Sequence, residues 1–529
     1  MHLSDPWPLQ RKTAEDNLLP LRRWLTLSRW VISTRSMASR GSRGETSARP
    51  PNIVTIVLDA ARAKNFSVSG GDQLARTPAI DSLAARGTTF PRAVAAANWT
   101  VPSHFSLFTG KYPNVHGVRT FQKVPGLPET TATHLRQAGY ETAMFTENLH
   151  LAGGYGLEEG VDVLRSRRIG VSREQRTVVN RLSSRVNFAY SAPTRKLISE
   201  VPPIVAPLSL LFHSQEVAYK RDVCGQYTLD WFSEWIRQRS TDRPFHAFFN
   251  FVDTHDPYDL VANGHRIGVL ERIYLTAPRY YMLSVPGFQS HLQWGALLRG
   301  YIRSIEEADR KIAQLLATLQ ENREVDRTLV IVTSDHGQSF GEGGNIFHGC
   351  GATDSVTRVP LVVAPPAGMQ VPRRVERWVS LCEVDSWIRS AASGLVPFGE
   401  DGHAPFPQSA RSPSSEVVYC EGGPASDQVR SLTGIGMDQA WNHRLLAAYR
   451  GNEKFVVDLD TGEIRRWEGP GDSDQKTPEP LPAASAATVR REVFGPYEVE
   501  EANRRARAAG GPAPMDLEID ERLKSWGYD

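Results

Sequence analysis

Five residues that could bind a metal ion come directly after apolar segments of the sequence. They are Asp59, Asp253, His255, Asp335 and His336. In open α/β sheets the carboxyl ends of parallel strands meet at one edge, and ligands bind there. A single aspartate in such a place often only caps a helix. Because the same placement occurs three times along the chain, we predict one site at this edge, with Asp59, Asp335 and His336 as metal ligands.

Thr100 lies in a further segment whose composition suits a site. The sequence from Trp99 is Trp-Thr-Val-Pro-Ser-His, in which Pro102 and Ser103 suit the first turn of a helix. Thr100 would then lie at or near the helix N-cap, where unpaired backbone N–H groups and the helix dipole attract anions. Taken alone, the segment favours the simpler interpretation that Thr100 only caps the helix.

The elements that must position these residues follow an α/β pattern. From residue 51 onward, short buried runs alternate with helix-like segments, which indicates a large, mainly parallel (mixed) sheet sandwiched by helices. Strands are predicted at 52–58, 141–145, 246–252, 328–333 and 360–363. Helices are predicted between Thr77 and Gly87 and over 298–319, the second with an apolar stripe typical of core packing.

Shifts in composition divide the chain into five parts. They are a basic N-terminal extension at 1–50, a main domain at 51–395, a linker at 396–415, a small antiparallel C-terminal subdomain at 416–467, and a low-complexity segment with a tail at 468–529. Within the main domain, 165–221 holds 11 Lys and Arg against three Asp and Glu. We interpret this stretch as a basic insertion over the sheet.

Composition excludes several classes of protein. The 529 residues are 40% hydrophobic and 23% charged, which argues against wholesale disorder. The formal charge of +2 indicates no nucleic-acid partner. Four cysteines without a Cys-x-x-Cys pair give no zinc or disulfide framework. With no signal peptide or transmembrane segment evident, we expect a cytoplasmic protein; peripheral membrane contact through 1–50 or 165–221 is an alternative, and the oligomeric state stays open.

Several ordered motifs resemble the sulfatase branch of the alkaline phosphatase superfamily. They are Asn-Ile-Val-x-Ile-Val-Leu-Asp59, Thr-Pro-x-Ile-Asp81, Trp-Thr100-x-Pro-Ser-His-x-Ser-Leu-Phe-Thr-Gly110, Tyr112-Pro-x-x-His116-Gly, Asp253-x-His255-Asp-Pro-Tyr258 and Thr-Ser-Asp335-His336-Gly. They occur in family order between about residues 51 and 394. The resemblance makes 51–395 the catalytic domain of a hydrolase that acts on phosphoric or sulfuric esters.

The resemblance implies one divalent metal ion held by Asp59, Asp335 and His336, with Thr100 reaching the same metal as nucleophile. In the family this position is normally a Cys or Ser that is oxidised to formylglycine. Threonine cannot form that aldehyde, because its β-carbon carries a methyl group, so we expect no formylglycine. Ala60 also replaces a second aspartate ligand of many sulfatases. With His336 supplying nitrogen, the site favours Mn²⁺ or Zn²⁺, with Ca²⁺ as an alternative.

Basic residues that resemble the family's substrate shell are His255, His348, Lys111 and His104. The resemblance assigns His255 and His348 to catalysis, at the ester oxygens or the leaving group, and it makes Lys111 and His104 candidates for substrate binding. His104 stands where the family has arginine. A second metal held by Asp253, His255 and His348 is an alternative, as in two-metal members of the superfamily.

These residues favour hydrolysis of an anionic phosphate or phosphonate ester through Thr100. Three alternatives stay open: a sulfatase without formylglycine, a transferase that passes a phosphoryl or phospho-alcohol group to an acceptor, and a non-catalytic descendant that only binds. The substrate itself is not predicted.

Overall fold

The computed structural model describes residues 49–72, 74–119, 127–148, 150–152, 156–166, 225–256, 258, 294–342, 346–349, 351–405, 416–423, 443–469 and 479–508. The N-terminal extension up to residue 48, the basic insertion from residue 167 and the linker from residue 406 lie outside the described residues. So does the C-terminal tail from residue 509. The predictions made for these segments therefore stay predictions.

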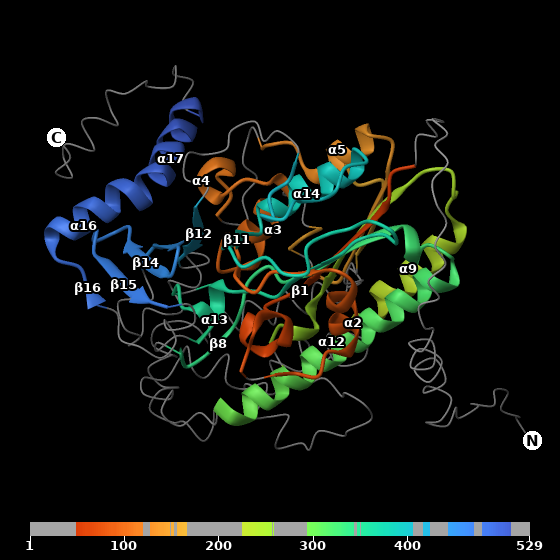
Figure 1. Ribbon diagram of the computed structural model, residues 1–529, viewed down its shortest axis with the longest axis horizontal. Helices are drawn as coiled ribbons and strands as arrows, with labels where there is room; N and C mark the ends of the chain where they lie inside the picture. Colours follow the sequence, from red (N-terminus) through yellow and green to blue (C-terminus); the bar gives the residue numbers. More distant parts are fainter. Residues whose placement is uncertain are drawn as a thin grey trace, which may run out of the picture. The chain divides into compact units, whose positions relative to one another are not determined.

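A seven-stranded sheet forms the core of the main domain (Figure 1). Its order is β2 (Thr88–Thr89), β10 (Leu361–Ala364), β7 (Thr328–Thr333), β1 (Asn52–Leu58), β6 (Phe245–Phe251), β4 (Glu141–Thr146) and β5 (Val163–Ser166). The strands from β7 to β5 are parallel, and β10 runs antiparallel to both of its neighbours. The mixed, mainly parallel sheet is thus confirmed, and each predicted strand agrees with an observed one to within one residue at either end.

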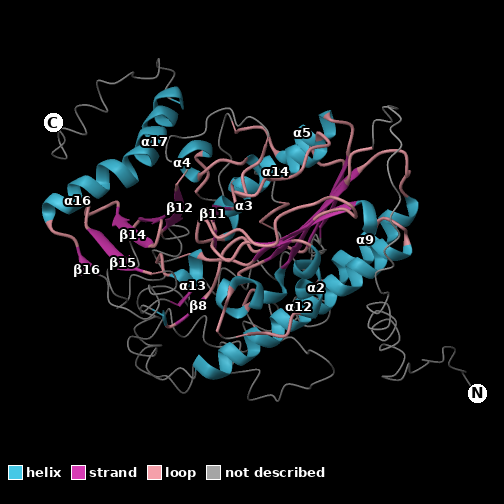
Figure 2. Cartoon of the chain, in the orientation of Figure 1, coloured by secondary structure: helices cyan, strands magenta, loops and turns pink. Residues whose placement is uncertain are grey.

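Helices cover both faces of this sheet (Figures 1 and 2). One face carries α2 (Pro78–Arg86), α9 (Gln226–Gln238) and α12 (Trp294–Glu321), and the other carries α3 (Thr100–Thr109), α5 (Thr131–Gln137) and α14 (Glu383–Ala392). In β1, Val54 and Ile56 pack toward the first layer, whereas Ile53 and Val57 pack toward the second. A strand buried on both faces must be apolar throughout, which explains the unbroken run in the sequence.

A separate antiparallel sheet follows near the C-terminus. Its order is β12 (Val417–Gly422), β13 (Leu445–Arg450), β14 (Glu453–Asp458), β15 (Ile464–Glu468) and β16 (Glu479–Pro480). This confirms the predicted antiparallel C-terminal sheet. The described part of 468–508, however, is more than a low-complexity tail, because it contains α16 (Ala483–Val489) and α17 (Gly495–Ala508). Val493 and Phe494 between these helices pack against the sheet.

A buried ion pair fixes the C-terminal sheet to the main domain. Lys454 Nζ on β14 lies 2.7 Å from Asp354 Oδ1, and the Tyr449 hydroxyl donates to the same oxygen over 2.7 Å. Burial would raise the pKa of Asp354, but Lys454 and Arg358 together lower it well below its ordinary value. A buried charge of this kind is stable only while its partners remain in place.

Further elements connect these layers. They are β3 (Ala93–Val94) with β11 (Val379–Ser380), β8 (Ser339–Phe340) with β9 (Ile346–Phe347), the short helices α4 (Pro113–His116) and α13 (Asp354–Thr357), the 3₁₀ turns at Ala63–Asn65, Ser67–Ser69, Val252–Thr254 and Val325–Arg327, and a π-helical turn at Arg490–Phe494. None of the helices in the described part of the chain has both the length and the apolar character needed to cross a membrane.

Candidate active site

Asp59, Asp335 and His336 meet at the carboxyl edge of the main sheet. Asp59 directly follows β1, and Asp335 and His336 follow β7. All three side chains are buried, and one ligand atom from each lies within 4.8 Å of the others. His336 Nε2 is 3.4 Å from Asp335 Oδ2 and 3.8 Å from Asp59 Oδ1. The topology has therefore brought together the three residues that the sequence placed after two separate strands.

Each of the two carboxylates has one oxygen fixed by a neighbour and one left over. Asn148 Nδ2 donates to Asp59 Oδ2 over 2.7 Å, and the backbone N–H groups of Ala60 and His336 donate to Asp335 Oδ1 over 3.1 and 3.0 Å. The other oxygens, Asp59 Oδ1 and Asp335 Oδ2, are buried and have no hydrogen-bond partner among the described residues. Buried polar atoms without partners are rare in native proteins and call for a ligand.

The imidazole of His336 is oriented in the same way. Its Nδ1 lies 2.9 Å from the Gly337 carbonyl oxygen. A carbonyl oxygen only accepts, so Nδ1 carries the proton and the lone pair is on Nε2, which faces both carboxylates. This arrangement is typical of metal-binding histidines.

Burial makes the ionised form of the two carboxylates in this group unfavourable when no cation compensates their charge. Desolvation raises the pKa of Asp59, with a further contribution from Asp335, and it raises the pKa of Asp335 to about 7. Desolvation also lowers the pKa of His336. Two neighbouring carboxylates and a neutral imidazole at 0–1% exposure fit a divalent cation, which would compensate both buried charges.

Thr100 lies beside the same group of side chains, on α3, in the helix layer that also contains α5 and α14. Trp99 is the N-cap of α3 and Thr100 is its first helical residue, so the threonine is not the capping residue. Its hydroxyl Oγ1 lies 3.3 Å from His336 Nε2. The hydroxyl thus lies beside the candidate metal ligands at the positive end of a ten-residue helix.

His104 lies one helical turn further along α3 and is completely buried. Its Nδ1 donates to the Thr100 carbonyl oxygen over 2.8 Å and is 3.4 Å from Asp335 Oδ2, and its Nε2 is 3.4 Å from Asn250 Nδ2. Burial lowers the pKa of His104 to about 3, so the ring is neutral. The described contacts of His104 are thus with other side chains and backbone of the site, and the substrate contact suggested for His104 stays a prediction.

His255 and His348 lie beside the ligand group. The ring centroid of His348 is 4.5 Å from that of His336 and 4.7 Å from that of His255. Both side chains are partly exposed, in contrast to the buried Asp59, Asp335 and His336. The structure therefore brings both histidines close to the three candidate ligands.

Asp253 and Lys111 make contacts elsewhere. Asp253 forms an ion pair with Lys311 on α12. α3 has ten residues and is therefore about 15 Å long at 1.5 Å per residue, and Lys111 lies beyond its C-terminal end, opposite to Thr100. Burial raises the pKa of the Cys382 thiol at the start of α14, and the charge of Lys111 partly opposes this. The described contacts thus give no support to Lys111 as a substrate-binding residue.

Two asparagines that contact the site residues were not predicted from the sequence. Asn148 follows β4, and its position just after a strand was the signal that could have indicated it. Asn250 lies within β6, where nothing in the pattern distinguishes it from its apolar neighbours.

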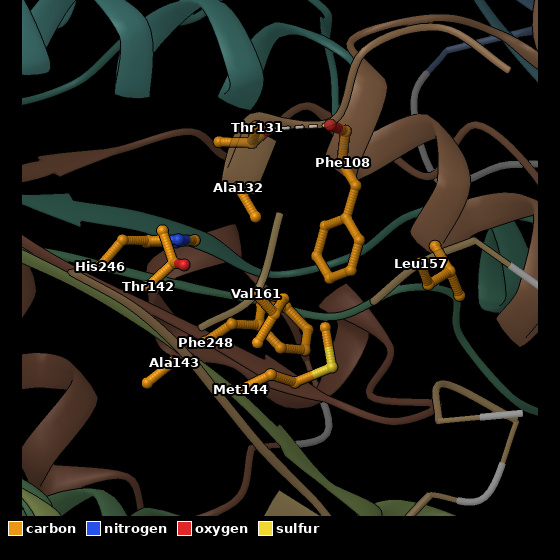
Figure 3. A pocket seen from close by; sticks show the side chains of 10 residues that line it. All are labelled: Phe108, Thr131, Ala132, Thr142, Ala143, Met144, Leu157, Val161, His246 and Phe248. Carbon is orange, nitrogen blue, oxygen red and sulfur yellow. Dashed lines mark hydrogen bonds between the residues drawn. The ribbon is translucent and has the colours of Figure 1, made fainter. Parts of the chain in front are cut away.

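A small cavity between β4, β6 and α5 is lined by none of these residues (Figure 3). It has a volume of about 10 Å³ and is lined mainly by apolar side chains, among them Phe108, Met144 and Phe248. That volume holds about one water molecule. It is a packing defect in the core and too small for a substrate.

Comparison with known proteins gives the family. The sulfatase family model matches residues 51–385. Arylsulfatase K of Rattus norvegicus is 21% identical over 406 residues, covering 70% of this chain and 65% of that protein. Choline-sulfatase of Rhizobium meliloti is 26% identical over 345 residues, covering 60% and 63%. The chain therefore matches slightly less than two thirds of the length of these two relatives.

Solved structures agree with this fold. Phosphonate monoester hydrolase of Agrobacterium radiobacter superposes with a TM-score of 0.54 at 18% identity, over 86% of this chain and 96% of that one. The phosphonate monoester hydrolase of Silicibacter pomeroyi gives the same TM-score and identity, over 84% and 94%. Since the family model covers well over half of the sequence, the chain belongs to the sulfatase family.

Proposed function

We propose that the protein hydrolyses phosphate or phosphonate esters with Thr100 as the nucleophile. The observation that carries this proposal is the position of Thr100 Oγ1, 3.3 Å from His336 Nε2 and at the N-terminus of α3. A hydroxyl beside two buried carboxylates and an imidazole has the surroundings of an activated nucleophile.

A divalent cation held by Asp59, Asp335 and His336 would supply positive charge and Lewis acidity beside the Thr100 hydroxyl. Mn²⁺ and Zn²⁺ suit this mixture of two carboxylates and one nitrogen better than Ca²⁺ does. Asn148 and the backbone N–H groups of Ala60 and His336 hold one oxygen of each carboxylate, so that the other would be left for the cation.

The reaction has two steps. Thr100 Oγ1 loses its proton and bonds to phosphorus, and the bond from phosphorus to the ester oxygen breaks, releasing an alcohol that takes up a proton. Water then attacks phosphorus while the bond from phosphorus to Thr100 Oγ1 breaks. One proton of the water passes to Oγ1, which restores the threonine hydroxyl and frees phosphate or phosphonate. The positive N-terminal end of α3 would stabilise the charge on the transferred oxygens. His255 and His348 lie on the exposed side of the ligand group, where the ester oxygens must enter.

Phosphorus is favoured over sulfur as the reacting centre because threonine cannot form formylglycine. An enzyme with formylglycine releases sulfate by collapse of a hydrated aldehyde, and threonine offers no such route. A phospho-threonine needs only water at phosphorus. The phosphonate monoester hydrolases among the structural neighbours agree with this choice of substrate.

Hydrolysis of a sulfate ester is the second candidate, because the relatives matched by sequence are named arylsulfatase and choline-sulfatase. The site would then act without formylglycine. A metal site that stabilises charge on transferred oxygens can serve either centre.

The test compares Thr100→Ser, Thr100→Ala and a matched control, Thr109→Ala. Thr109 lies at the other end of α3, where its hydroxyl donates to the Phe105 carbonyl oxygen. On aryl phosphodiesters and phosphonates we expect appreciable kcat in Thr100→Ser and in the control, and a loss on the order of a thousandfold or more in Thr100→Ala. Unchanged activity in Thr100→Ala on every substrate would show that Thr100 is structural.

A further inference from the structure

A second group of metal-binding side chains lies beside the first. It consists of His255, Asp256 and His348, whose ligand atoms also lie within 4.8 Å of one another. His255 and Asp256 follow the turn after β6, and His348 follows β9. Asp256 is 3% exposed, while the two histidines are partly exposed. Two imidazoles and one carboxylate are the ligand set that Zn²⁺ and other first-row divalent ions prefer.

Both imidazoles are held in the orientation of metal ligands. His255 Nδ1 lies 2.7 Å from the Asp256 carbonyl oxygen, and His348 Nδ1 lies 2.7 Å from Gln338 Oε1. Both partners are oxygens that only accept, so each Nδ1 carries the proton and each lone pair is on Nε2. Gln338 is fixed in turn, because its Nε2 donates to the Tyr258 hydroxyl. Such outer contacts set the tautomer and ring plane of metal-binding histidines.

The acidic member of this group is Asp256 and not Asp253. The carboxylate of Asp253 is committed to Lys311 on α12. Asp256 Oδ1, in contrast, lies 3.4 Å from the His255 ring. The alternative ligand set of Asp253, His255 and His348 from the sequence is therefore replaced by one with Asp256.

We propose that His255, Asp256 and His348 bind a second divalent cation next to the one at Asp59, Asp335 and His336. The proximity of the His336 and His348 rings makes the two groups neighbours. This inference rests on the proposed function, which it deepens: a dication held by one carboxylate and two neutral imidazoles keeps a net positive charge. That charge lies on the exposed side, where the anionic ester must enter.

Metal stoichiometry tests the proposal. The full-length protein is stripped with a chelator, reloaded separately with Zn²⁺ and Mn²⁺, freed of excess metal by gel filtration and analysed by mass spectrometry of the elements. We expect two equivalents per chain in the wild type with at least one of the two metals, and one equivalent in His348→Gln and in Asp256→Asn. Circular dichroism should show the same fold in each. The control is His443→Gln, which removes a histidine paired with Asp458 on β14 and should keep two equivalents.

A wild-type protein that saturates at one equivalent of either metal, with that equivalent retained in His348→Gln and Asp256→Asn, would overturn the second site. The histidines would then contact the ester oxygens directly. If this protein still hydrolysed esters through Thr100, only the present inference would fail. Two equivalents combined with a fully active Thr100→Ala would overturn only the proposed function.

Discussion

Asn148 fixes which oxygen of Asp59 faces the centre of the site. Its Nδ2 donates to Asp59 Oδ2 over 2.7 Å, and its own Oδ1 accepts from the backbone N–H of His150 over 2.9 Å. The amide therefore cannot rotate without losing a contact. Asp59 Oδ1 is left 3.8 Å from His336 Nε2.

Asn148→Ala should lower metal affinity by roughly 10- to 100-fold, the usual effect of removing a partner that orients a ligand. The ligands themselves remain, so metal should still bind at high concentration. Competition with a chromogenic chelator measures the affinity. Asn114→Ala is the control, because Asn114 is also buried but donates to the Tyr497 carbonyl oxygen. Equal affinity in both variants would contradict the orienting role.

Asp335→Asn should lose far more metal affinity than Asn148→Ala, since it removes the charge of a ligand. The metal-free variant should nevertheless melt at the same or a higher temperature than the metal-free wild type at pH 8. The reason is that desolvation raises the pKa of Asp335 to about 7, so the native state is strained by its ionisation. Metal analysis and thermal melting give the two readouts. A variant that retains full metal content would refute the site.

The sheet and the position of three candidate ligands at its edge could be predicted because they depend on local patterns. β1 and β7 are unbroken apolar runs, and a sheet buried on both faces allows nothing else, so Asp59 and Asp335 stand out at their ends. The residues that orient these ligands could not be predicted in the same way. Asn250 is one polar residue within a buried strand, and only the packing of α3 shows that it meets His104.

The N-terminus of α2 is capped by a side chain that is distant in the sequence. Thr77 is the N-cap residue of α2, as the sequence indicates, but its side chain makes no capping bond. Asp309 on α12 accepts from the backbone N–H groups of Ala79 and Ile80 over 3.0 and 2.9 Å instead. A cap from more than 200 residues away leaves no signal in the local sequence. Similarly, the alanines of α16 resemble low complexity until Val493 and Phe494 are seen against the C-terminal sheet.

Asp309 should make stability depend on pH. Burial raises its pKa to about 6 from an ordinary 3.8, although the two backbone N–H groups oppose this. The native state therefore binds more protons than the unfolded state between these values. Its contribution to the free energy of unfolding is complete below about pH 4 and is lost as the pH rises to about 6, a change of about 3 kcal/mol. Urea unfolding at several pH values measures the free energy of unfolding of the wild type and of Asp309→Asn. The wild-type value minus the variant value should fall as the pH rises over this range.

The matched control for that experiment is Asp72→Asn, which changes an aspartate whose side chain is 63% exposed. If the wild type and Asp309→Asn showed parallel pH profiles, Asp309 would not be the group responsible.

Lys454→Met should destabilise the C-terminal sheet. The change leaves Asp354 buried without the cation that lies 2.7 Å away, which typically costs 3–5 kcal/mol. The double variant Lys454→Met/Asp354→Asn removes both charges and should recover most of this loss. Limited proteolysis and thermal melting measure the effect. Equal losses in the single and double variants would mean that packing, and not the unpaired charge, causes the destabilisation.

The choice between phosphorus and sulfur separates the two candidate functions. If Thr100 forms a covalent intermediate, aryl phosphodiesters or phosphonates should give many turnovers, because water can attack a phospho-threonine at phosphorus. Aryl sulfates should give at most one burst, since a sulfo-threonine cannot release sulfate through a hydrated aldehyde. That burst should be accompanied by a mass gain on the peptide that contains Thr100, and Thr100→Ala should show neither. Steady turnover of a sulfate ester, with all phosphorus esters inert, would instead identify a sulfatase that uses threonine or water directly.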